Sequence, residues 1–582
     1  MAKLSRRDLL ALLAATPLSA AGARKPNIIV LLSDDQAWGD LSVTGNINLS
    51  TPNIDSLARD GALFDRFFVC PLCAPSRAEF LTGRYFPRGG VKGVSEGEER
   101  LNVDERTIAD TFRANGYATG AFGKWHNGSQ FPYHPNARGF DQYYGITSGH
   151  WPNYFDTAMD CNGQFVRGKG YITDDLTDHA IAFIEKNKAK PFLCYLPWNS
   201  PHSPMQVPEK YWEKFSRMNP VMRDADPGRE DLGMTRAALA MCENIDWNVG
   251  RVLKKLEELK LANDTIVLYF SDNGPASWRW NGGMRGRKGT TDEGGVRSPL
   301  LIRWPGHIAP GTRVTSIAGA IDLLPTLADM AGIPTDSKKP LDGKVLTPLL
   351  TGGRVDWADR MIFSAQNQRV SVRTQQFRLD DQGRLYNMVA DPGQAHDVTA
   401  AEPAVAAQLK SAVAAWRAEV LQPGKDNRPF TVGDSKLTWL PARDGHTAGS
   451  VKRSSQYPNS SFFTNWSSKD DEIWWDVEVS NAGEFEVVVE YTCPPTDVGS
   501  TIEMSFLDAK VRAKVAVAHD PPLLGASADR VPRIESYYKE FRPLSLGRVA
   551  LAKGKGRLSL RATAIPGRLV ADVYSLQLTR RI

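Results

Sequence analysis

The 582-residue chain is poor in cysteine and nearly balanced in charge. Its six cysteines lack the dense spacing of a disulfide scaffold, and a chain of this length can bury a core without one. Lys and Arg number 71 against 66 Asp and Glu, so the net charge of +5 does not indicate a nucleic-acid partner. Beyond the N-terminus, no apolar run approaches the roughly 20 residues that cross a bilayer. Internal repeats are also lacking, so any recognition through charge must be local.

The N-terminus, MAKLSRRDLLALLAATPLSAAGA, has the pattern of an export signal. Arg6 and Arg7 precede an apolar run at 9–18, and residues 21–23 form an A-x-A cleavage site. This pattern predicts a signal peptide of twin-arginine type over residues 1–23, and a periplasmic or secreted protein. The alternative is an N-terminal membrane anchor, but the apolar run is shorter than the roughly 20 residues of a membrane span.

Strand and helix patterns alternate over residues 24–350. A continuous apolar, β-branched run at 27–32 is typical of a buried parallel strand, and residues 265–270 repeat the pattern. Between them, apolar residues recur at helical spacing over 245–259, as on a helix that packs against a sheet. Strands alternating with helices predict an α/β fold with helices on both faces of the sheet. Further strand-like runs lie at 117–123, 191–198 and 299–306.

Polar side chains follow two of these predicted strands. Asp34 and Asp35 come after the first strand, and Asp272 and Asn273 come after the second. Because ligands collect at the carboxyl ends of strands in such sheets, we expect the four side chains to share one site. All-oxygen ligation favours Ca²⁺ or Mg²⁺ over zinc. The alternative is that both pairs are ordinary polar turn residues.

The pattern changes after a predicted helix at 322–331. Residues 369–386 predict short antiparallel strands and residues 403–420 a helix, which together make a small subdomain over 351–425. After a linker near 421–430, residues 431–582 alternate strand-like runs with turns, which predicts an appended β-sandwich. Its aromatic stretch NWSSKDDEIWWDVEV resembles carbohydrate-binding modules, although a purely structural role fits equally well.

Cationic side chains occur in three further motifs. Each one alone is more often structural or solvated, but beside a metal they suit the binding of a compact oxyanion such as sulfate or phosphate. The motif GKWHNG contains Lys124 and His126, spaced to project on one side of an extended segment. The other candidates are His202 in NSPHSP and Arg285, Arg287 and Lys288 in the glycine-rich loop GGMRGRKGTTDEGG.

The cysteines pose a separate question, because an exported protein must pair, bury or use its thiols. Cys194 and Cys242 lie in apolar stretches and are expected to pack in the core. Whether Cys70 and Cys161 pair is left open. Cys73, in the pentapeptide CAPSR, has no evident partner.

The run CAPSRAEFLTGR, at 73–84, resembles the signature C-x-P-S-R-x-x-x-L-T-G-R of the type I sulfatases in the alkaline phosphatase superfamily. The segments TPNIDSLARDGALFDRFF, GKWH, PHSP, FSDNG and GRKGTTDEGGVRSP also resemble that family, and they occur in its order. The resemblance spans about residues 25–420 and leaves the final β domain outside. It implies an alkaline-phosphatase-like sheet sandwiched by helices and the hydrolysis of sulfuric esters.

The resemblance also implies a covalent mechanism. A maturation enzyme would oxidise Cys73 to Cα-formylglycine, whose hydrate carries two hydroxyls on one carbon. One hydroxyl would attack sulfur, and loss of the other's proton would then expel sulfate without attack by water. The implied Ca²⁺ ligands are the two polar pairs at the strand ends, with residue 73 facing the metal: Asp34, Asp35, Asp272 and Asn273.

Further roles follow for the cationic residues. Arg77 would orient the diol, while Lys124 and Lys288 would bind sulfate oxygens. His126 is implied as the base that triggers expulsion of sulfate. His202, with Lys288, is implied as the acid that protonates the leaving alcohol.

Export and nearby aromatic residues favour a sulfated polysaccharide or oligosaccharide as substrate. Aromatic faces with polar neighbours suit stacking on sugar rings, although such residues are as often part of a core. The sugar, the position of the sulfate, and endo or exo action are left open. The candidate substrate-binding residues are His150, Trp151, Trp278, Trp280 and Arg285.

Two alternatives compete with this interpretation. One is a phosphate or phosphonate monoester hydrolase of the same superfamily, which shares the metal chemistry. The other is a non-catalytic glycan-binding protein with an inactive sulfatase-like domain, although every core position of the motif is intact. All catalytic candidates lie before residue 300, so the β domain is expected to capture or shield the substrate and to take no part in chemistry.

Overall fold

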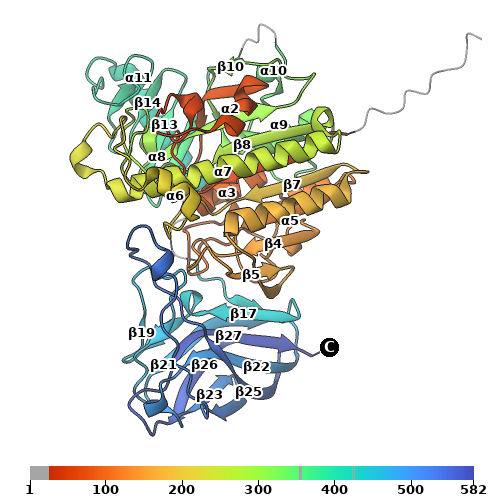
Figure 1. Cartoon of the computed structure of the whole chain (residues 1–582), viewed down its shortest axis with the longest axis vertical. Helices are drawn as coiled ribbons and strands as arrows, with labels where there is room; N and C mark the ends of the chain where they lie inside the picture. The colour runs from red at the N-terminus through yellow and green to blue at the C-terminus, as the bar shows by residue number, and fades with distance from the viewer. Residues whose placement is uncertain (1–24, 353–356, 422–423, 425, 582) are drawn as a thin grey trace, which may run out of the picture.

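The computed structural model describes residues 25–352, 357–421, 424 and 426–581, so the predicted signal peptide lies outside the described residues. Figure 1 shows an N-terminal α/β domain above a C-terminal β domain. The central sheet of the N-terminal domain has the order β10-β2-β9-β8-β1-β7-β3-β4-β5-β6, and β11 also pairs with β2. Its strands are β1 (Asn27–Ser33), β2 (Ala62–Phe68), β3 (Ala118–Lys124), β4 (Gln142–Ile146), β5 (Ala158–Cys161), β6 (Gln164–Arg167), β7 (Phe192–Pro197), β8 (Thr265–Ser271), β9 (Arg297–Arg303), β10 (Thr312–Val314) and β11 (Ala318–Gly319).

The middle of the sheet is parallel and fully buried. β1 lies between β7 and β8 and runs parallel to both. All seven residues of β1 and all seven of β8 are buried, as the continuous apolar runs predict. The predicted strands at 117–123, 191–198 and 299–306 are confirmed as β3, β7 and β9, with β9 antiparallel to β8.

Helices cover both faces of this sheet, as predicted (Figure 1). Alternate residues of β1 point to opposite faces, so Ile29 and Leu31 pack against α2, α5 and α7, while Ile28 and Val30 pack against α3, α4 and α9. The helix predicted from the 245–259 periodicity is the C-terminal part of α7. The helices are α2 (Pro52–Arg59), α3 (Cys73–Thr82), α4 (Ile108–Ala114), α5 (Ile172–Asn187), α6 (Glu209–Phe215), α7 (Leu232–Glu258), α8 (Glu293–Val296), α9 (Leu323–Met330) and α10 (Thr347–Leu350).

A small second sheet follows, as expected for the 351–425 region. Its order is β12-β13-β14-β15, and all its pairings are antiparallel. Helix α11 packs on it through Ala406 and Leu409, which meet Val372 and Leu379 in a shared apolar cluster. The elements are β12 (Ile362–Gln366), β13 (Arg369–Arg373), β14 (Phe377–Leu379), β15 (Leu385–Asn387) and α11 (Pro403–Val420).

The C-terminal domain consists of two six-stranded sheets that pack around one apolar core. Val487 and Val489 of one sheet and Ile473 and Val477 of the other are fully buried in that core, which confirms the expected β-sandwich. Its strands are β16 (Phe430–Val432), β17 (Leu437–Pro441), β18 (His446–Ala448), β19 (Lys452–Arg453), β20 (Phe463–Thr464), β21 (Glu472–Val479), β22 (Gly483–Thr492), β23 (Thr501–Phe506), β24 (Ala509–Lys514), β25 (Arg542–Leu551), β26 (Gly554–Ala564) and β27 (Asp572–Arg580).

The two domains meet through buried polar contacts. Gln130 Nε2 donates to Asp444 Oδ2 at 3.0 Å and to the Trp439 carbonyl at 3.0 Å. The segment 515–541, between β24 and β25, also reaches the N-terminal domain, where Arg530 N donates to the Met205 carbonyl at 2.9 Å. In Figure 1 part of this blue segment, with a short helix, rises toward α6.

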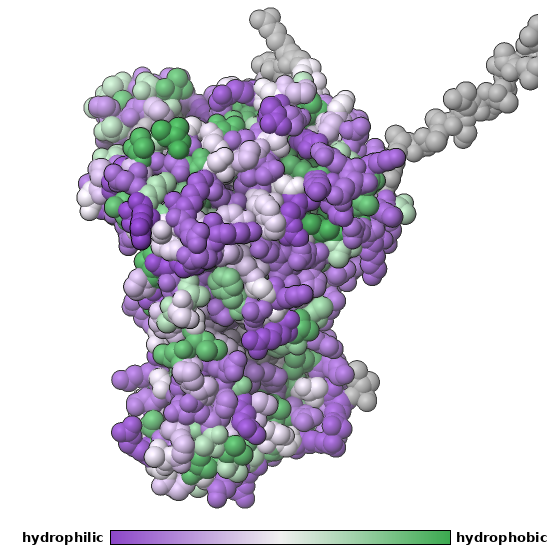
Figure 2. Space-filling model, viewed as in Figure 1, coloured by the Kyte–Doolittle hydropathy of each residue, from purple (hydrophilic) through white to green (hydrophobic). Residues whose placement is uncertain are grey.

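The molecular surface is mostly polar in the view of Figure 2, with scattered apolar patches, some of them near the junction of the two domains. Within the described residues, no helix combines the length and the apolar character needed to cross a membrane.

Candidate active site

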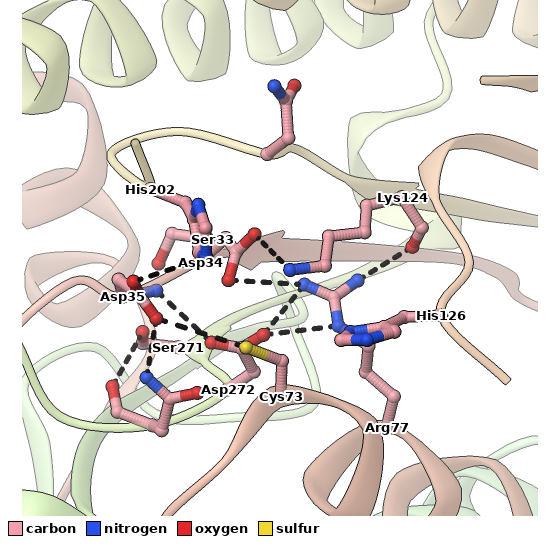
Figure 3. A network of polar contacts seen from close by, with 12 residues as sticks. Ser33, Asp34, Asp35, Cys73, Arg77, Lys124, His126, His202, Ser271 and Asp272 are labelled. Atoms are coloured by element: carbon pink, nitrogen blue, oxygen red, sulfur yellow. Dashed lines mark hydrogen bonds and ion pairs between the residues drawn. The ribbon is translucent and has the colours of Figure 1, made fainter. Parts of the chain in front are cut away.

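The polar pairs predicted to share a site come together at the carboxyl ends of β1 and β8 (Figure 3). These strands are neighbours and in register, with Ser33 opposite Ser271, so the residues that follow them emerge side by side. Asp35 N donates to Asp272 Oδ1 at 3.2 Å. Asn273 Nδ2 donates to Asp35 Oδ1 at 2.8 Å. Parallel pairing therefore joins two motifs that are far apart in the sequence.

Helix α3 brings Cys73 and Arg77 to the same point. Cys73 is the first residue of this wholly buried helix, and its Sγ lies 3.9 Å from Asp35 Oδ1. Arg77, one turn later, projects on the same side. Its Nη2 donates to Asp272 Oδ2 at 2.7 Å and its Nη1 donates to the Lys124 carbonyl at 2.6 Å. Burial raises the pKa of the Cys73 thiol far above its usual value, so the unmodified side chain is a poor nucleophile.

Two lysines pair with the acidic residues. Lys124 Nζ lies 2.6 Å from Asp34 Oδ2, and Lys288 Nζ lies 2.6 Å from Asp35 Oδ1. Burial raises the pKa of Asp35, but the nearby Lys288, His202 and Lys124 outweigh it and hold that pKa well below the usual range. Burial, helped by the charge of Asp34, raises the pKa of Asp272 to about 6 against the effect of Arg77. The site thus concentrates charges of both signs away from water.

The cluster fits a hard cation. Asp34, Asp35, Cys73 and His202 each offer one ligand atom, and these atoms all lie within 4.8 Å of one another. Asp34 Oδ1 and Asn273 Oδ1 are buried without a hydrogen-bond partner. Because buried oxygens without a hydrogen bond are costly, two such atoms in one cluster fit the coordination of a cation. Oxygen donors are those that Ca²⁺ and Mg²⁺ prefer.

The two catalytic-candidate histidines reach the site from loops. β3 ends at Lys124, and His126 adopts a left-handed φ of 63°, so the expected extended segment from 124 to 126 is wrong. His126 Nε2 lies 2.8 Å from the Val94 carbonyl. His202 Nε2 lies 3.7 Å from Asp35 Oδ2, and burial, with the charge of Lys288, lowers the pKa of His202 to about 4.

Comparison with known proteins identifies the family of this chain. The family model described as "Sulfatase" matches residues 26–333, and a model described as "N-sulphoglucosamine sulphohydrolase, C-terminal" matches residues 288–419. The chain belongs to the sulfatase family. Its activity is therefore that of a sulfuric ester hydrolase.

Curated relatives and solved structures agree with this assignment. Human arylsulfatase A (Homo sapiens) is 33% identical over 440 residues, which cover 68% of this chain and 81% of that protein. N-acetylgalactosamine-6-sulfatase from Sus scrofa is 32% identical over 411 residues, covering 64% of this chain and 75% of that protein. The crystal structure of Ps i-CgsB superposes with a TM-score of 0.62 at 29% identity, covering 69% of this chain and 95% of the other.

The expected substrate-binding residues of this sulfatase lie in different surroundings. His150 is buried near His202, with ring centroids 5.6 Å apart. Trp151 is part of the apolar core and donates from Nε1 to Thr157 Oγ1 at 2.9 Å.

The remaining three candidates already have partners. The Trp278 ring faces the guanidinium of Arg229 at 3.8 Å. The Trp280 ring lies close to Gly39. Arg285 donates to Asp292, Asp380 and Tyr386, so its guanidinium is committed to contacts within the protein.

The open question about the cysteines is settled for the described residues. Cys70 and Cys161 are both free, so they do not pair. Cys194 and Cys242 are fully buried in the apolar core, as expected.

Two residues near the site escaped the sequence analysis. Glu535, in the C-terminal domain, accepts a hydrogen bond from Ser203 Oγ at 2.6 Å, directly beside His202. Asn127 Nδ2 donates to the Ala74 carbonyl at 3.2 Å and so fixes the backbone next to Cys73. Asn127 lies within the GKWHNG motif but had no predicted role, whereas Glu535 belongs to no motif. Glu535 lies in the β domain, whose predicted role is outside the chemistry.

Proposed function

We propose that this sulfatase removes sulfate from a sulfated carbohydrate, with formylglycine at position 73 and Ca²⁺ at the acidic cluster. The main support for a carbohydrate substrate is a cleft between the two domains. Its volume of about 450 Å³ lies within the usual range of ligand sites. Aromatic side chains from both domains line it, including Phe165, Trp439 and Tyr538, and such faces suit stacking on sugar rings. Trp151 and Pro152, which follow His150 in the chain, line the same cleft.

Known relatives support a carbohydrate substrate. One relative is named for N-acetylgalactosamine 6-sulfate, and Ps i-CgsB, at 29% identity, has been solved in complex with k-i-k-neocarrahexaose. A phosphate or phosphonate ester is the weaker alternative, because the family model and these relatives are sulfatases. A purely glycan-binding role is also disfavoured, since every predicted catalytic side chain is present.

The metal would be held by Asp34, Asp35, Asp272 and Asn273, and it would supply positive charge for the nucleophile and for a sulfate oxygen. Mg²⁺ is the second choice. Lys124 and Lys288 already face this cluster and would bind sulfate oxygens, whose charge grows in the transition state.

Three further side chains would orient groups or move protons. Arg77 would orient the hydrated residue 73. His126 would take the proton that starts release of sulfate. His202 Nδ1–H would donate to the Ser203 carbonyl at 2.7 Å, so Nε2 is the nitrogen that would take up the second proton and deliver it to the leaving alcohol. The negative charge of bound sulfate would offset the positive charges of the neighbouring lysines and so raise the pKa of His202.

The modification at Cys73 has a physical reason. The thiol is buried with a raised pKa, whereas an aldehyde hydrate offers one hydroxyl to attack sulfur and a second to expel sulfate. A formylglycine-generating maturation enzyme is thus an implied partner. We also propose export to the periplasm or beyond through the twin-arginine signal, which N-terminal sequencing of the mature protein would test.

A substrate screen tests the proposed function. Full-length enzyme from a host with a maturation enzyme is incubated with monosulfated galactose, glucose and N-acetylhexosamine saccharides, with 4-nitrophenyl sulfate, and with 4-nitrophenyl phosphate. Ion chromatography measures the released anion. We expect sulfate release from at least one saccharide at a kcat/KM above that for 4-nitrophenyl sulfate. Preference for the phosphate ester, or hydrolysis of the aryl sulfate alone, would contradict the proposal.

A further inference from the structure

His150 is a buried polar side chain without a partner. It is 4% exposed, and neither of its ring nitrogens has a hydrogen-bond partner within the described part of the chain. Leaving such a group unpaired is costly, so buried polar groups in native proteins are rarely left without a ligand or water. Burial lowers the pKa of His150 to about 3, so the ring is neutral and offers one donor and one acceptor.

Glu535 provides a carboxylate in the same region. Ser203 Oγ donates to its Oε1 at 2.6 Å, and Ser203 directly follows His202. Burial raises the pKa of Glu535, but the charge that His150 carries at low pH and the Ser203 hydrogen bond outweigh it and lower that pKa below its usual value. Glu535 is therefore ionised and can only accept hydrogen bonds.

The segment that carries Glu535 is firmly anchored beside these residues. The side chain of Arg533 is 1% exposed, pairs with Asp529 and donates to the Pro152 carbonyl. Gln206 Nε2 donates to Asp529 Oδ1 at 2.8 Å and to the Gly525 carbonyl at 3.0 Å. These contacts, which all precede Glu535 in the chain, hold this segment of the C-terminal domain against the N-terminal domain.

We propose that His150 and Glu535 form a hydroxyl-binding subsite, shared between the two domains, that recognises the sugar next to its scissile sulfate ester. This inference rests on the proposed carbohydrate substrate. A sugar hydroxyl can donate to Glu535, and another can pair with the neutral His150 ring. Because Glu535 is anionic, it repels a second sulfate or a carboxylate at that place. The enzyme therefore prefers a sugar with free hydroxyls beside the sulfate over its disulfated counterpart.

The test compares selectivity between matched substrates. The best monosulfated saccharide from the screen is assayed beside its deoxy analogue, which lacks the neighbouring hydroxyl, and beside the form sulfated there. For Glu535→Gln we expect kcat/KM on the monosulfated sugar to fall about tenfold, mainly through KM, and the rejection of the disulfated sugar to weaken. His150→Phe fills the same space without polar atoms and should reduce the preference over the deoxy analogue.

The control is Glu540→Gln on the same segment, whose exposed carboxylate lies 3.9 Å from Arg167 and which should keep wild-type selectivity. Melting temperatures of all variants show whether the fold is kept, and Glu535→Gln retains the shape needed to accept from Ser203. If the wild type hydrolyses a sugar sulfate but neither variant changes the ratios between these substrates, the subsite is wrong and the proposed function stands. If the wild type hydrolyses no sugar sulfate, both are overturned.

Discussion

The two domains of this sulfatase contribute to its active site in different ways. In the N-terminal domain, the candidate metal ligands and catalytic residues come from the carboxyl ends of β1, β3 and β8, from the start of α3, and from the loops after β7 and before α8. The C-terminal domain contributes the anchored segment 515–541, which places the Glu535 carboxylate beside Ser203 and His202. The first arrangement follows from sheet topology, whereas the second depends on how two separate cores dock. We propose that the N-terminal domain determines the chemistry and that the C-terminal segment determines the selectivity.

The largest effect is expected at the acidic cluster. Asp34→Asn keeps the shape of the side chain but removes a charge that would hold the cation, so kcat on 4-nitrophenyl sulfate should fall by at least about a hundredfold. Metal analysis of the purified variant should show reduced Ca²⁺. Asp60→Asn is the control, because Asp60 forms only an exposed pair with Arg59. Full activity of the Asp34 variant, with its metal content unchanged, would contradict the assigned role.

A smaller effect is expected from a change that touches no charge. A Cβ at Gly149 would lie 2.2 Å from His126 Nε2, so Gly149→Ala should displace the ring and lower kcat about tenfold. Gly556→Ala is the control, because its Cβ would meet its nearest neighbour at an ordinary 3.5 Å. Equal loss of kcat in both variants would mean that the effect is not specific to His126.

The docking of the two domains can be weakened without touching the active site. Gln130→Ala removes two hydrogen bonds to the C-terminal domain and leaves Asp444 with fewer partners. We expect a loss of about 1–3 kcal/mol in unfolding free energy, seen as a lower denaturant midpoint. If docking also sets selectivity, the preference for the monosulfated sugar should weaken in this variant. An unchanged midpoint would show that these contacts do not hold the domains together.

The last prediction leaves activity aside and concerns the pH dependence of stability, through a buried acid in α3. Burial raises the pKa of Glu79 from 4.5 to about 8, so the folded protein keeps a proton there that the unfolded chain loses. Unfolding free energy therefore falls as the pH rises from about 5 to 8. The substituted side chain of the Glu79→Gln variant cannot ionise, so the melting temperature of this variant should increase relative to that of the wild type as the pH rises from about 5 to 8. A difference in melting temperature between the variant and the wild type that stays constant with pH would contradict the raised pKa of Glu79.

Much of the N-terminal domain could be predicted from the sequence, because the strands that local apolar runs mark are also neighbours in the sheet. The apolar runs before Asp34 and Asp272 mark adjacent parallel strands, and register alone then brings the polar residues together. The left-handed turn at His126 could not be predicted, since the GKWH motif does not encode the φ angle. Glu535 could not be found either, because its position depends on how the segment 515–541 docks on the other domain.

The most direct test of the whole account is the mass of the tryptic peptide 67–77 from active enzyme. The account predicts that the peptide carries an aldehyde in place of the Cys73 thiol, and that the modified fraction of different preparations rises in proportion to their specific activity. Cys73→Ala should abolish activity while keeping the melting temperature close to that of the wild type. A fully active preparation in which residue 73 is entirely an unmodified thiol would contradict the central claim.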